Sequence, residues 1–345
     1  MATIFDFLNA DYLAAYWDTL QREKAPYFFE KMFPADKKLG IDLNYIKGKS
    51  GIPVTLKISA FDVKAIPRER IGFQSLTAEM PFFKESTYID EKLRQELNLV
   101  LQTGNQMYID TIMNRIFADS AQLLESATVT RERMRAMAMT TGAISMASNG
   151  QSYTYDYQMP NSHKFTAPSF NTEDFDIADY LNDICDLIDT DTGVRPTNVV
   201  LSRSQWNKIK NNKFMAKNIY VMTNGVGTIN DRIAKQYLED NTGLKFEIYS
   251  KKYQNEEGQV INFIPDDLLV LYPDGNLGKT WFGTTPEESD LMASPNVADV
   301  KIVDTGVAIK IIKEADPVNA QTVVSMICLP SFEMVDRIAL IDTSV

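Results

Sequence analysis

Apolar and polar positions alternate with different periods along the chain, so the sequence predicts a mixture of helices and strands. Within residues 41–88 the period is close to two, as in strands that bury one face. From residue 90 to about 124, apolar side chains instead recur at helical spacing, which predicts a long helix. A second helix is expected over about 130–146, because a threonine ahead of Glu132 forms a capping box with it.

The second half of the chain has shorter predicted elements. A strand over 152–158 is followed by a polar segment with a proline at 163–172, which we interpret as a linker. Helices are then predicted at 172–189, 202–210 and 228–239, and strands at 198–201, 219–222, 245–250, 259–264, 268–272, 297–313, 319–329 and 332–341. This order predicts an α+β fold in which the late strands return to the sheet begun near residue 152.

Two segments need another surface to pack on. Residues 52–58 and 80–88 are predicted strands of a long hairpin with a charged tip, and an isolated hairpin is at best marginally stable in water. Residues 1–34 are rich in aromatic side chains and include a predicted helix that Asn9 or Asp11 could cap. We expect each segment to pack either on its own domain or on a neighbouring subunit.

Composition narrows the class of protein. The chain has 345 residues, enough for two domains or one elaborated domain, and its 44% hydrophobic and 23% charged residues are ordinary for a folded soluble protein. The formal net charge of -11 argues against a surface that grips nucleic acid, because such surfaces need clustered Lys and Arg. An acidic protein can still enclose nucleic acid, since a wall that repels phosphate lets packed DNA slide.

The cysteines and the lengths of the apolar runs indicate in which cellular compartment the protein is expected. Cys185 and Cys328 lie in apolar runs and are expected to be buried, reduced thiols. No apolar stretch approaches the about 20 residues that cross a bilayer, and the N-terminus lacks the basic start and cleavage site of a signal peptide. These features favour a protein that is made and kept in the cytosol, without membrane contact.

Three short motifs are similar to ligand-binding loops but lack a required residue. Before Gly278-Lys279-Thr280, a phosphate-binding loop needs a glycine where Pro273 stands. The second motif begins with Gly225-Val226-Gly227 and is similar to a dinucleotide-binding fingerprint, but Asn230 stands where the third glycine is needed. We expect Thr228 to cap a helix there instead. Residues 189–193 lack the third oxygen ligand and the final Glu of a calcium loop, and predict the end of a helix.

The single histidine offers little chemistry. His163 falls in the predicted linker and is expected to be exposed, and no carboxylate pair has a distinctive spacing. We therefore predict no catalytic residue, no cofactor, no metal site and no enzyme activity. A nucleotide-dependent enzyme built on residues 219–280 is the least favoured alternative.

The most informative segment is 249–285, which predicts short strands separated by turns. Tyr253 lies in the first strand, Gly258 in a hairpin turn, and Phe263-Ile264-Pro265-Asp266 leads to a buried strand with Val270-Leu271. This order resembles a passage in the major capsid proteins of lambda-type tailed phages, the phage capsid E family.

The resemblance covers nearly the whole chain as a pattern of elements. Gly51-Ile52-Pro53 is similar to the start of the family's long hairpin, and Pro67-Arg68-Glu69-Arg70 to its basic return. A long helical spine follows, and then Val199-Val200-Leu201 stands ahead of Trp206 as the family's strand stands before an aromatic helix. The order and spacing together carry the likeness.

The resemblance implies an α+β fold of the Hong Kong 97 capsid type. Its parts would be an N-terminal arm (1–40), an extended hairpin loop (41–88), a peripheral domain with a spine helix (89–170 and 297–345) and an axial domain (171–296). It would be the major capsid (head) protein of a tailed bacteriophage, class Caudoviricetes, or of a prophage.

The resemblance also implies an assembly and its partners. The subunits would self-assemble as pentamers and hexamers of an icosahedral shell that encloses double-stranded DNA. The protein would reside in the virion after assembly in the bacterial host cytoplasm, with scaffold, portal and decoration proteins as expected partners. An encapsulin-like cellular shell is the alternative, followed by a tail or other virion component.

Residues of the hairpin tip and of the arm are candidates for contacts between subunits. The basic residues cluster in an otherwise acidic chain and are expected to pair with acids on neighbours, whereas the aromatic ones would bury apolar surface there. The candidates are Lys64, Arg68, Arg70, Phe5, Phe7 and Trp17.

Overall fold

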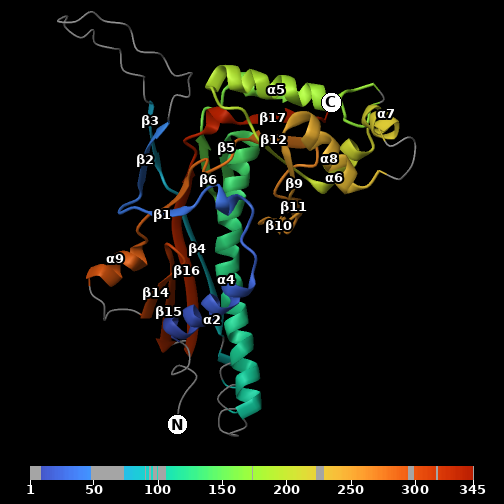
Figure 1. Cartoon of the computed structure of the whole chain (residues 1–345). Helices are drawn as coiled ribbons and strands as arrows, with labels where there is room; N and C mark the ends of the chain where they lie inside the picture. The colour runs from blue at the N-terminus through green and yellow to red at the C-terminus, as the bar shows by residue number, and fades with distance from the viewer. Residues whose placement is uncertain are drawn as a thin grey trace, which may run out of the picture. The chain divides into compact units, whose positions relative to one another are not determined.

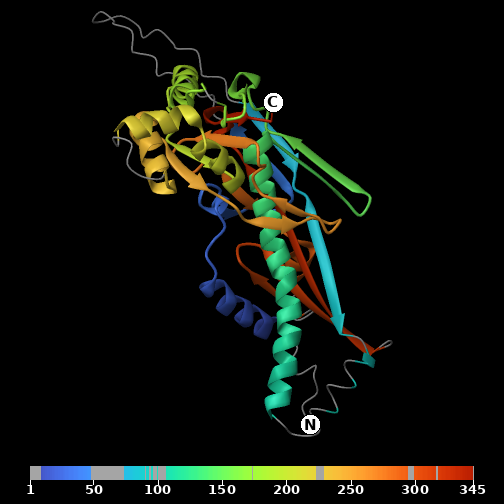
Figure 2. The same cartoon turned by 90° about the vertical axis from the view of Figure 1, so that its right-hand side faces the viewer.

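The chain divides into two compact units, which are described separately. The computed structural model describes residues 9–47, 74–89, 91–92, 95, 99, 106–172, 174–222, 229–293, 299–315 and 318–344 (Figures 1 and 2). Unit 1 comprises Met1–Asn44, Thr77–Arg135 and Lys279–Ser331, and unit 2 comprises Tyr45–Leu76, Ala136–Gly278 and Phe332–Val345. The chain is α+β, as predicted.

One long helix, α4 (Gln106–Thr141), replaces the two helices that the sequence predicted on either side of residue 128. Its 36 residues span about 54 Å, and they belong to unit 1 up to Arg135 and to unit 2 beyond it. The predicted capping threonines lie inside the helix, where the hydroxyls of Thr128 and Thr130 donate to the carbonyls of Leu124 and Ser126. The prediction of a helix start there was therefore wrong.

A mixed sheet forms the centre of unit 1. Its order is β1 (Ala35–Lys37), β13 (Lys279–Phe282), β16 (Val318–Ser331), β15 (Val307–Ala315) and β14 (Asp299–Val303), and β4 (Phe82–Ile89) also pairs with β16. The single strand predicted at 297–313 is thus the hairpin β14–β15, which turns at Asp304 with a φ of 49°.

One predicted strand pairing is wrong, and a second involves residues outside the described part of the chain. The late strands do not join the strand near residue 152, because β6 (Gln151–Asp156) pairs only with β5 (Ala143–Ser148) among the described strands. The segment 80–88, predicted to pair with 52–58, forms β4 and pairs with β16 along one side. Residues 52–58 lie outside the described residues, and the described strands β2 (Asp42–Lys47) and β3 (Gln74–Glu79) pair with each other.

Helices pack on the sheet of unit 1. Helix α2 (Ala10–Glu23) begins at Asn9, whose side chain accepts the amide of Tyr12, as the sequence allowed. It buries Leu13 and Trp17 and lies beside β14 and β15 (Figure 1). The short helices η1 (Phe29–Lys31) and α9 (Pro286–Ala293) complete the described helical elements assigned wholly to this unit.

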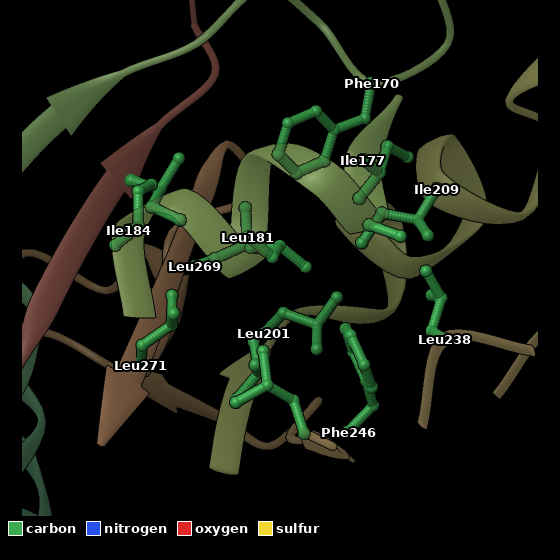
Figure 3. Close-up of a cluster of buried hydrophobic side chains, with 14 of the residues drawn as sticks. Phe170, Ile177, Leu181, Ile184, Leu201, Ile209, Leu238, Phe246, Leu269 and Leu271 are labelled. Carbon is green, nitrogen blue, oxygen red and sulfur yellow. The ribbon is translucent and has the colours of Figure 1, made fainter. Parts of the chain in front are cut away.

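The core of unit 2 is built on one face of a five-stranded sheet. The order is β7 (Lys164–Thr166), β17 (Ala339–Asp342), β12 (Leu268–Tyr272), β8 (Asn198–Leu201) and β9 (Lys245–Ile248). Leu269 and Leu271 stand opposite Leu201 and Val199 in the register, so their side chains share a face. Against this face pack α5 (Ile177–Thr192), α6 (Arg203–Lys210) and α8 (Asp231–Thr242), with Leu181, Ile209 and Leu238 (Figure 3).

Side chains that cap helices decide where the helices of unit 2 begin. The predicted helix at 202–210 is confirmed as α6, and Ser202 caps its start. The predicted strand at 219–222 is part of helix α7 (Lys213–Met222), because the buried side chain of Asn212 accepts the amide of Met215 and donates to the carbonyl of Phe170. The start of α5 is displaced from the predicted residue 172 to Asp176, which caps it.

The end of the chain is less regular than the predicted strand at 332–341. It forms η3 (Val335–Arg337) and then β17, which pairs with β12 and β7. The predicted strand at 198–201 and the predicted strand at 268–272 are confirmed as β8 and β12.

The ion pair between α9 and β4 gives a pH-dependent prediction for Glu287. Burial by itself raises the pKa of this carboxyl, but hydrogen bonds from Lys84 (2.7 Å) and Ser325 (2.8 Å) outweigh it and hold the pKa below its ordinary value. A lowered pKa contributes stability above the unfolded-state pKa, and this stability is lost as the pH falls through the folded-state pKa. Glu287→Gln should therefore lower the free energy of unfolding by about 1–3 kcal/mol at neutral pH, and by progressively less as the pH falls below the ordinary carboxyl pKa of about 4.3.

Denaturant unfolding of the purified chain at two pH values checks this. Glu85→Gln, at an exposed position of β4, serves as the control and should change little. An equal loss of stability for Glu287→Gln at pH 7 and pH 3.5 would contradict the assignment.

The end of α4 gives a second prediction, with a matched control in α8. Gly142 and Gly243 both follow a helix in the left-handed region, with φ of 73° and 71°. A Cβ on Gly142 would lie 2.8 Å from the Cβ of Met159, whereas Gly243 has open space around it. Gly243→Ala should cost about 1 kcal/mol for its backbone conformation, and Gly142→Ala about 1–3 kcal/mol more because Met159 must move. Equal losses in thermal unfolding of the two variants would show that Met159 gives way freely.

Candidate functional site

The segment that is similar to a phosphate-binding loop has a structural role. Gly278-Lys279-Thr280 leads into strand β13 rather than into a helix, so no helix N-terminus faces the loop. The hydroxyl of Thr280 donates to the carbonyl of Phe33 at 2.9 Å, and its amide bonds to the carbonyl of Pro34. The backbone and side chain that could meet a phosphate are therefore committed to the N-terminal segment.

The other two motifs also serve to begin and end helices. Asn230, not the predicted Thr228, caps α8, and its side chain accepts the amide of Ile233 at 3.0 Å; Thr228 lies outside the described residues. Gly193 ends α5 with a φ of 71°, and its amide donates to the carbonyl of Asp189. The prediction of a helix end at 189–193 is confirmed.

The prediction of an exposed His163 was wrong. Its side chain is 2% exposed, in the short helix η2 (Asn161–His163), and its Nε2 lies 3.3 Å from Oδ2 of Asp191. The segment taken for a linker is ordered because the following strand, β7, adds to β17 in the sheet of unit 2. The side-chain contact described for this buried imidazole is with a half-exposed carboxylate, not with a hydroxyl or thiol that it could activate.

The two cysteines are buried free thiols, as predicted. Burial raises the pKa of Cys185 to about 11 and that of Cys328 to about 12, so neither forms a thiolate at neutral pH. Within the described ranges, no group of three or more His, Cys, Asp or Glu side chains could hold a metal ion. A helix that is both long and apolar enough to cross a membrane is absent from the same residues.

The predicted contact residues fall mainly outside the described part of the chain. Phe5 and Phe7 precede residue 9, and Lys64, Arg68 and Arg70 lie between residues 47 and 74. For these five the inter-subunit role stays a prediction. Trp17 is described and is 0% exposed; a side chain buried so completely has no surface for a neighbour, so Trp17 fits the alternative of packing on its own domain.

Trp17 belongs to a polar cluster that ties the N-terminal helix to unit 1. Its indole Nε1 donates to Oδ1 of Asp304 at 3.2 Å, and Nη2 of Arg131 donates to Oδ2 of the same carboxylate at 2.8 Å. The guanidinium of Arg131 also lies over the ring of Phe282, 5.5 Å from its centroid. Asp304, in the turn of the β14–β15 hairpin, thus joins α2 to α4.

A second cluster lies one helical turn further along α4. Glu132 is 0% exposed; its Oε1 accepts the amide of Phe29 at 3.0 Å, and its Oε2 lies 3.5 Å from Nη1 of Arg135. Nε of Arg135 donates to the hydroxyl of Thr280 at 2.9 Å. Burial lowers the pKa of Arg135 and Glu132 acts against this, but an arginine keeps its charge.

Sequence reasoning missed both clusters, although a signal was present. Arg131 and Arg135 stand at the spacing of the buried positions Leu124, Ala127 and Ala138. A charge on the apolar stripe of a helix must be paired when it is buried. The partners in other elements, Asp304 and Thr280, could not be identified, because they lie more than a hundred residues away along the chain.

The segment 249–285 folds into the predicted strands and turns. Strands β10 (Lys252–Gln254) and β11 (Val260–Asn262) form a hairpin that turns at Gly258 with a φ of 82°. The ring of Phe263 lies 5.0 Å from that of Tyr253 and 5.7 Å from that of Tyr249, which fixes the hairpin from within unit 2. In β11 the side chain of Val260 is 68% exposed, so the hairpin lies at the surface.

Strand β4 presents the longest open edge of the sheet in unit 1. It pairs with β16 along one side, and no other described strand lies along its second side. Phe82 is 47% exposed and Tyr88 is 69% exposed, and their even spacing puts them on the same face. Large exposed apolar side chains on a strand edge are typical of a surface that meets another protein.

The structure is similar in fold to several phage proteins. A protein assigned as the capsid protein of a prophage of Escherichia coli CFT073 matches with a TM-score of 0.62 at 14% identity, over 98% of this chain and 99% of its own. A phage-related protein of Bordetella bronchiseptica RB50 matches with a TM-score of 0.57 at 11% identity, over 98% of both chains. The capsid of cyanophage A-1(L) matches with a TM-score of 0.50 at 9% identity, over 90% of this chain and 89% of its own.

Sequence comparison gives the family. No curated protein sequence matches this chain. The family model described as phage major capsid protein E matches residues 9–339, nearly the whole length. This match extends over both structural units. Among the predicted alternatives it favours a phage capsid protein over a tail component or an enzyme. The chain therefore belongs to the phage major capsid protein E family, and it is a structural capsid protein with a Hong Kong 97-like α+β fold, not an enzyme.

Proposed function

We propose that this chain is the repeating subunit of a tailed-phage or prophage head, which assembles as pentamers and hexamers of an icosahedral shell around double-stranded DNA. The observation that carries the proposal is the capsid family match over residues 9–339. The shell forms in the bacterial host cytoplasm and then remains in the virion, with scaffold, portal and decoration proteins as its partners.

The charge of the chain supports an enclosing rather than a gripping role. A net charge of -11 in 345 residues does not provide the clustered cations that hold phosphate. A closed acidic wall repels the DNA that it encloses. The DNA can therefore leave the shell without first breaking contacts between phosphate and protein.

The division into capsid parts belongs to the same proposal. It assigns residues 1–40 to an N-terminal arm, 41–88 to an extended hairpin loop, 89–170 with 297–345 to the peripheral domain and 171–296 to the axial domain. The long α4 supports the spine helix, and the strands β12, β8 and β9 with their covering helices support a compact axial domain. The part of the loop ahead of β4 is proposed to lie across the next subunit, because β4 itself belongs to the sheet of unit 1.

Imaging of the assembled product tests the function directly. The chain, expressed alone or together with its neighbouring genes and examined by negative-stain electron microscopy, should yield uniform closed shells or capsomers. A stable monomer at high concentration would overturn the proposal. Shells that contain DNA and portal protein support a phage head, whereas shells filled with an enzyme would indicate an encapsulin-like compartment instead.

Reversing two charges of the loop tests how the subunits meet. Arg68→Glu combined with Arg70→Glu should reduce shell yield by at least about tenfold, because several weak ion pairs are lost on every subunit and replaced by repulsion. The subunit should keep its circular dichroism spectrum and thermal midpoint. Lys217→Glu combined with Lys245→Glu, at exposed positions of α7 and β9, is the control that makes the same change of net charge elsewhere. Normal shells from the double variant would refute the contact.

A further inference from the structure

The edge of β4 is unusually well formed for an edge strand. Its register with β16 runs without interruption from Phe82, opposite Ile327, to Ile89, opposite Ala320. It contains no proline and no bulge, which are two of the ways of blocking an edge, and its lysine, Lys84, is paired with Glu287 of its own chain. About half of its eight backbone units therefore point away from β16 and can pair with another strand.

The other described sheet edges are shorter or covered. In unit 1, β1 has three residues, and β14 has five residues and lies against α2 and α9. In unit 2, β7 has three residues and β9 four. Figure 2 shows β4, in cyan, running along the long strands of its sheet.

The shell itself requires a contact between identical surfaces. An icosahedral shell has two-fold axes, and at each of them a surface of one subunit faces the same surface of another copy. A two-fold axis perpendicular to a sheet makes its edge strand antiparallel to its own copy and keeps each face on the same side. Residues that face each other across such an axis must therefore belong to the same face of the strand.

We propose that β4 pairs antiparallel with β4 of a second copy, about an axis at Ser86, and so joins the two sheets across a two-fold axis of the shell. In this register Lys84 faces Tyr88 of the other copy, Phe83 faces Ile89, and Glu85 faces Thr87. Each pair occurs twice, and no like charges meet. This inference rests on the icosahedral shell proposed above.

The chemistry of the pairs fits the second copy as the occupant. Phe83 with Ile89 is an aromatic and β-branched pair of the kind that stabilises antiparallel strands. Lys84 has a half-exposed side chain, and it can lie over the exposed ring of Tyr88 while it keeps its bond to Glu287. The strand is thus self-complementary over the seven residues centred on Ser86.

A single cysteine on the axis tests the contact. The native thiols are buried, so Ser86→Cys should provide the reactive pair, and mild oxidation or a short bis-maleimide should convert most subunits of assembled shells to covalent dimers. Thr190→Cys, at an exposed site of α5, is the control and should remain monomeric.

Each outcome of this experiment decides a different claim. Shells that form normally but give no Ser86→Cys dimers above the control would overturn the β4 contact and leave the proposed shell intact. Cross-links from residue 86 to a chain of another mass would assign the edge to another virion protein and overturn self-pairing. Failure of the unmodified chain to form shells would overturn the proposed function, and this inference with it.

A charge pair at position 88 provides a second test with its own control. Tyr88→Lys places like charges opposite Lys84 of the other copy, and two such pairs should weaken each contact by about fivefold. Tyr88→Glu makes the same position attractive and should assemble like the unmodified chain. Tyr88 is 69% exposed, so both variants should fold. Equal shell yields for the two variants at low salt would contradict the register.

Discussion

Two buried arginines in α4 constrain the rest of unit 1. A guanidinium that is removed from water must find hydrogen-bonding partners, or the fold pays a penalty of several kcal/mol. Arg131 finds the carboxylate of Asp304, and Arg135 finds Glu132 and the hydroxyl of Thr280. Those partners in turn bind Trp17, Phe29 and Phe33. The side chains that bind the two arginines therefore also hold the N-terminal segment.

Unit 2 is stabilised in a different way. Its sheet buries an apolar face under α5, α6 and α8, and buried Ser202 and Asn212 cap the helices that begin beside them. A hydrophobic core tolerates changes of sequence as long as volume and pattern are kept, whereas a buried ion pair depends on particular residues. This difference fits a fold that this chain shares with solved structures at 9–14% identity. The chemistry available to the chain is used for assembly and packing.

Sequence reasoning succeeded where the deciding interaction is local. Ser202 capping α6, the turn at Gly258 and the buried strand at 268–272 all depend on residues within a few positions. It failed where a distant partner decides. His163 is buried beside strand β7, which pairs with β17 more than 170 residues later, and Arg131 and Arg135 bind Asp304 and Thr280 in late strands and turns. The family pattern could be predicted from the order of elements, but the pairing of β4 with β16 could not.

The buried thiols have a consequence for the use of such particles in materials chemistry. A protein cage that is to carry dyes, drugs or antigens needs one attachment point per subunit and no competing nucleophile. Cys185 and Cys328 are the chain's only cysteines, and both are enclosed with pKa values of about 11 and 12. A maleimide would therefore not react with the unmodified chain. The number and position of conjugated groups would be set by the surface residue that is replaced with cysteine.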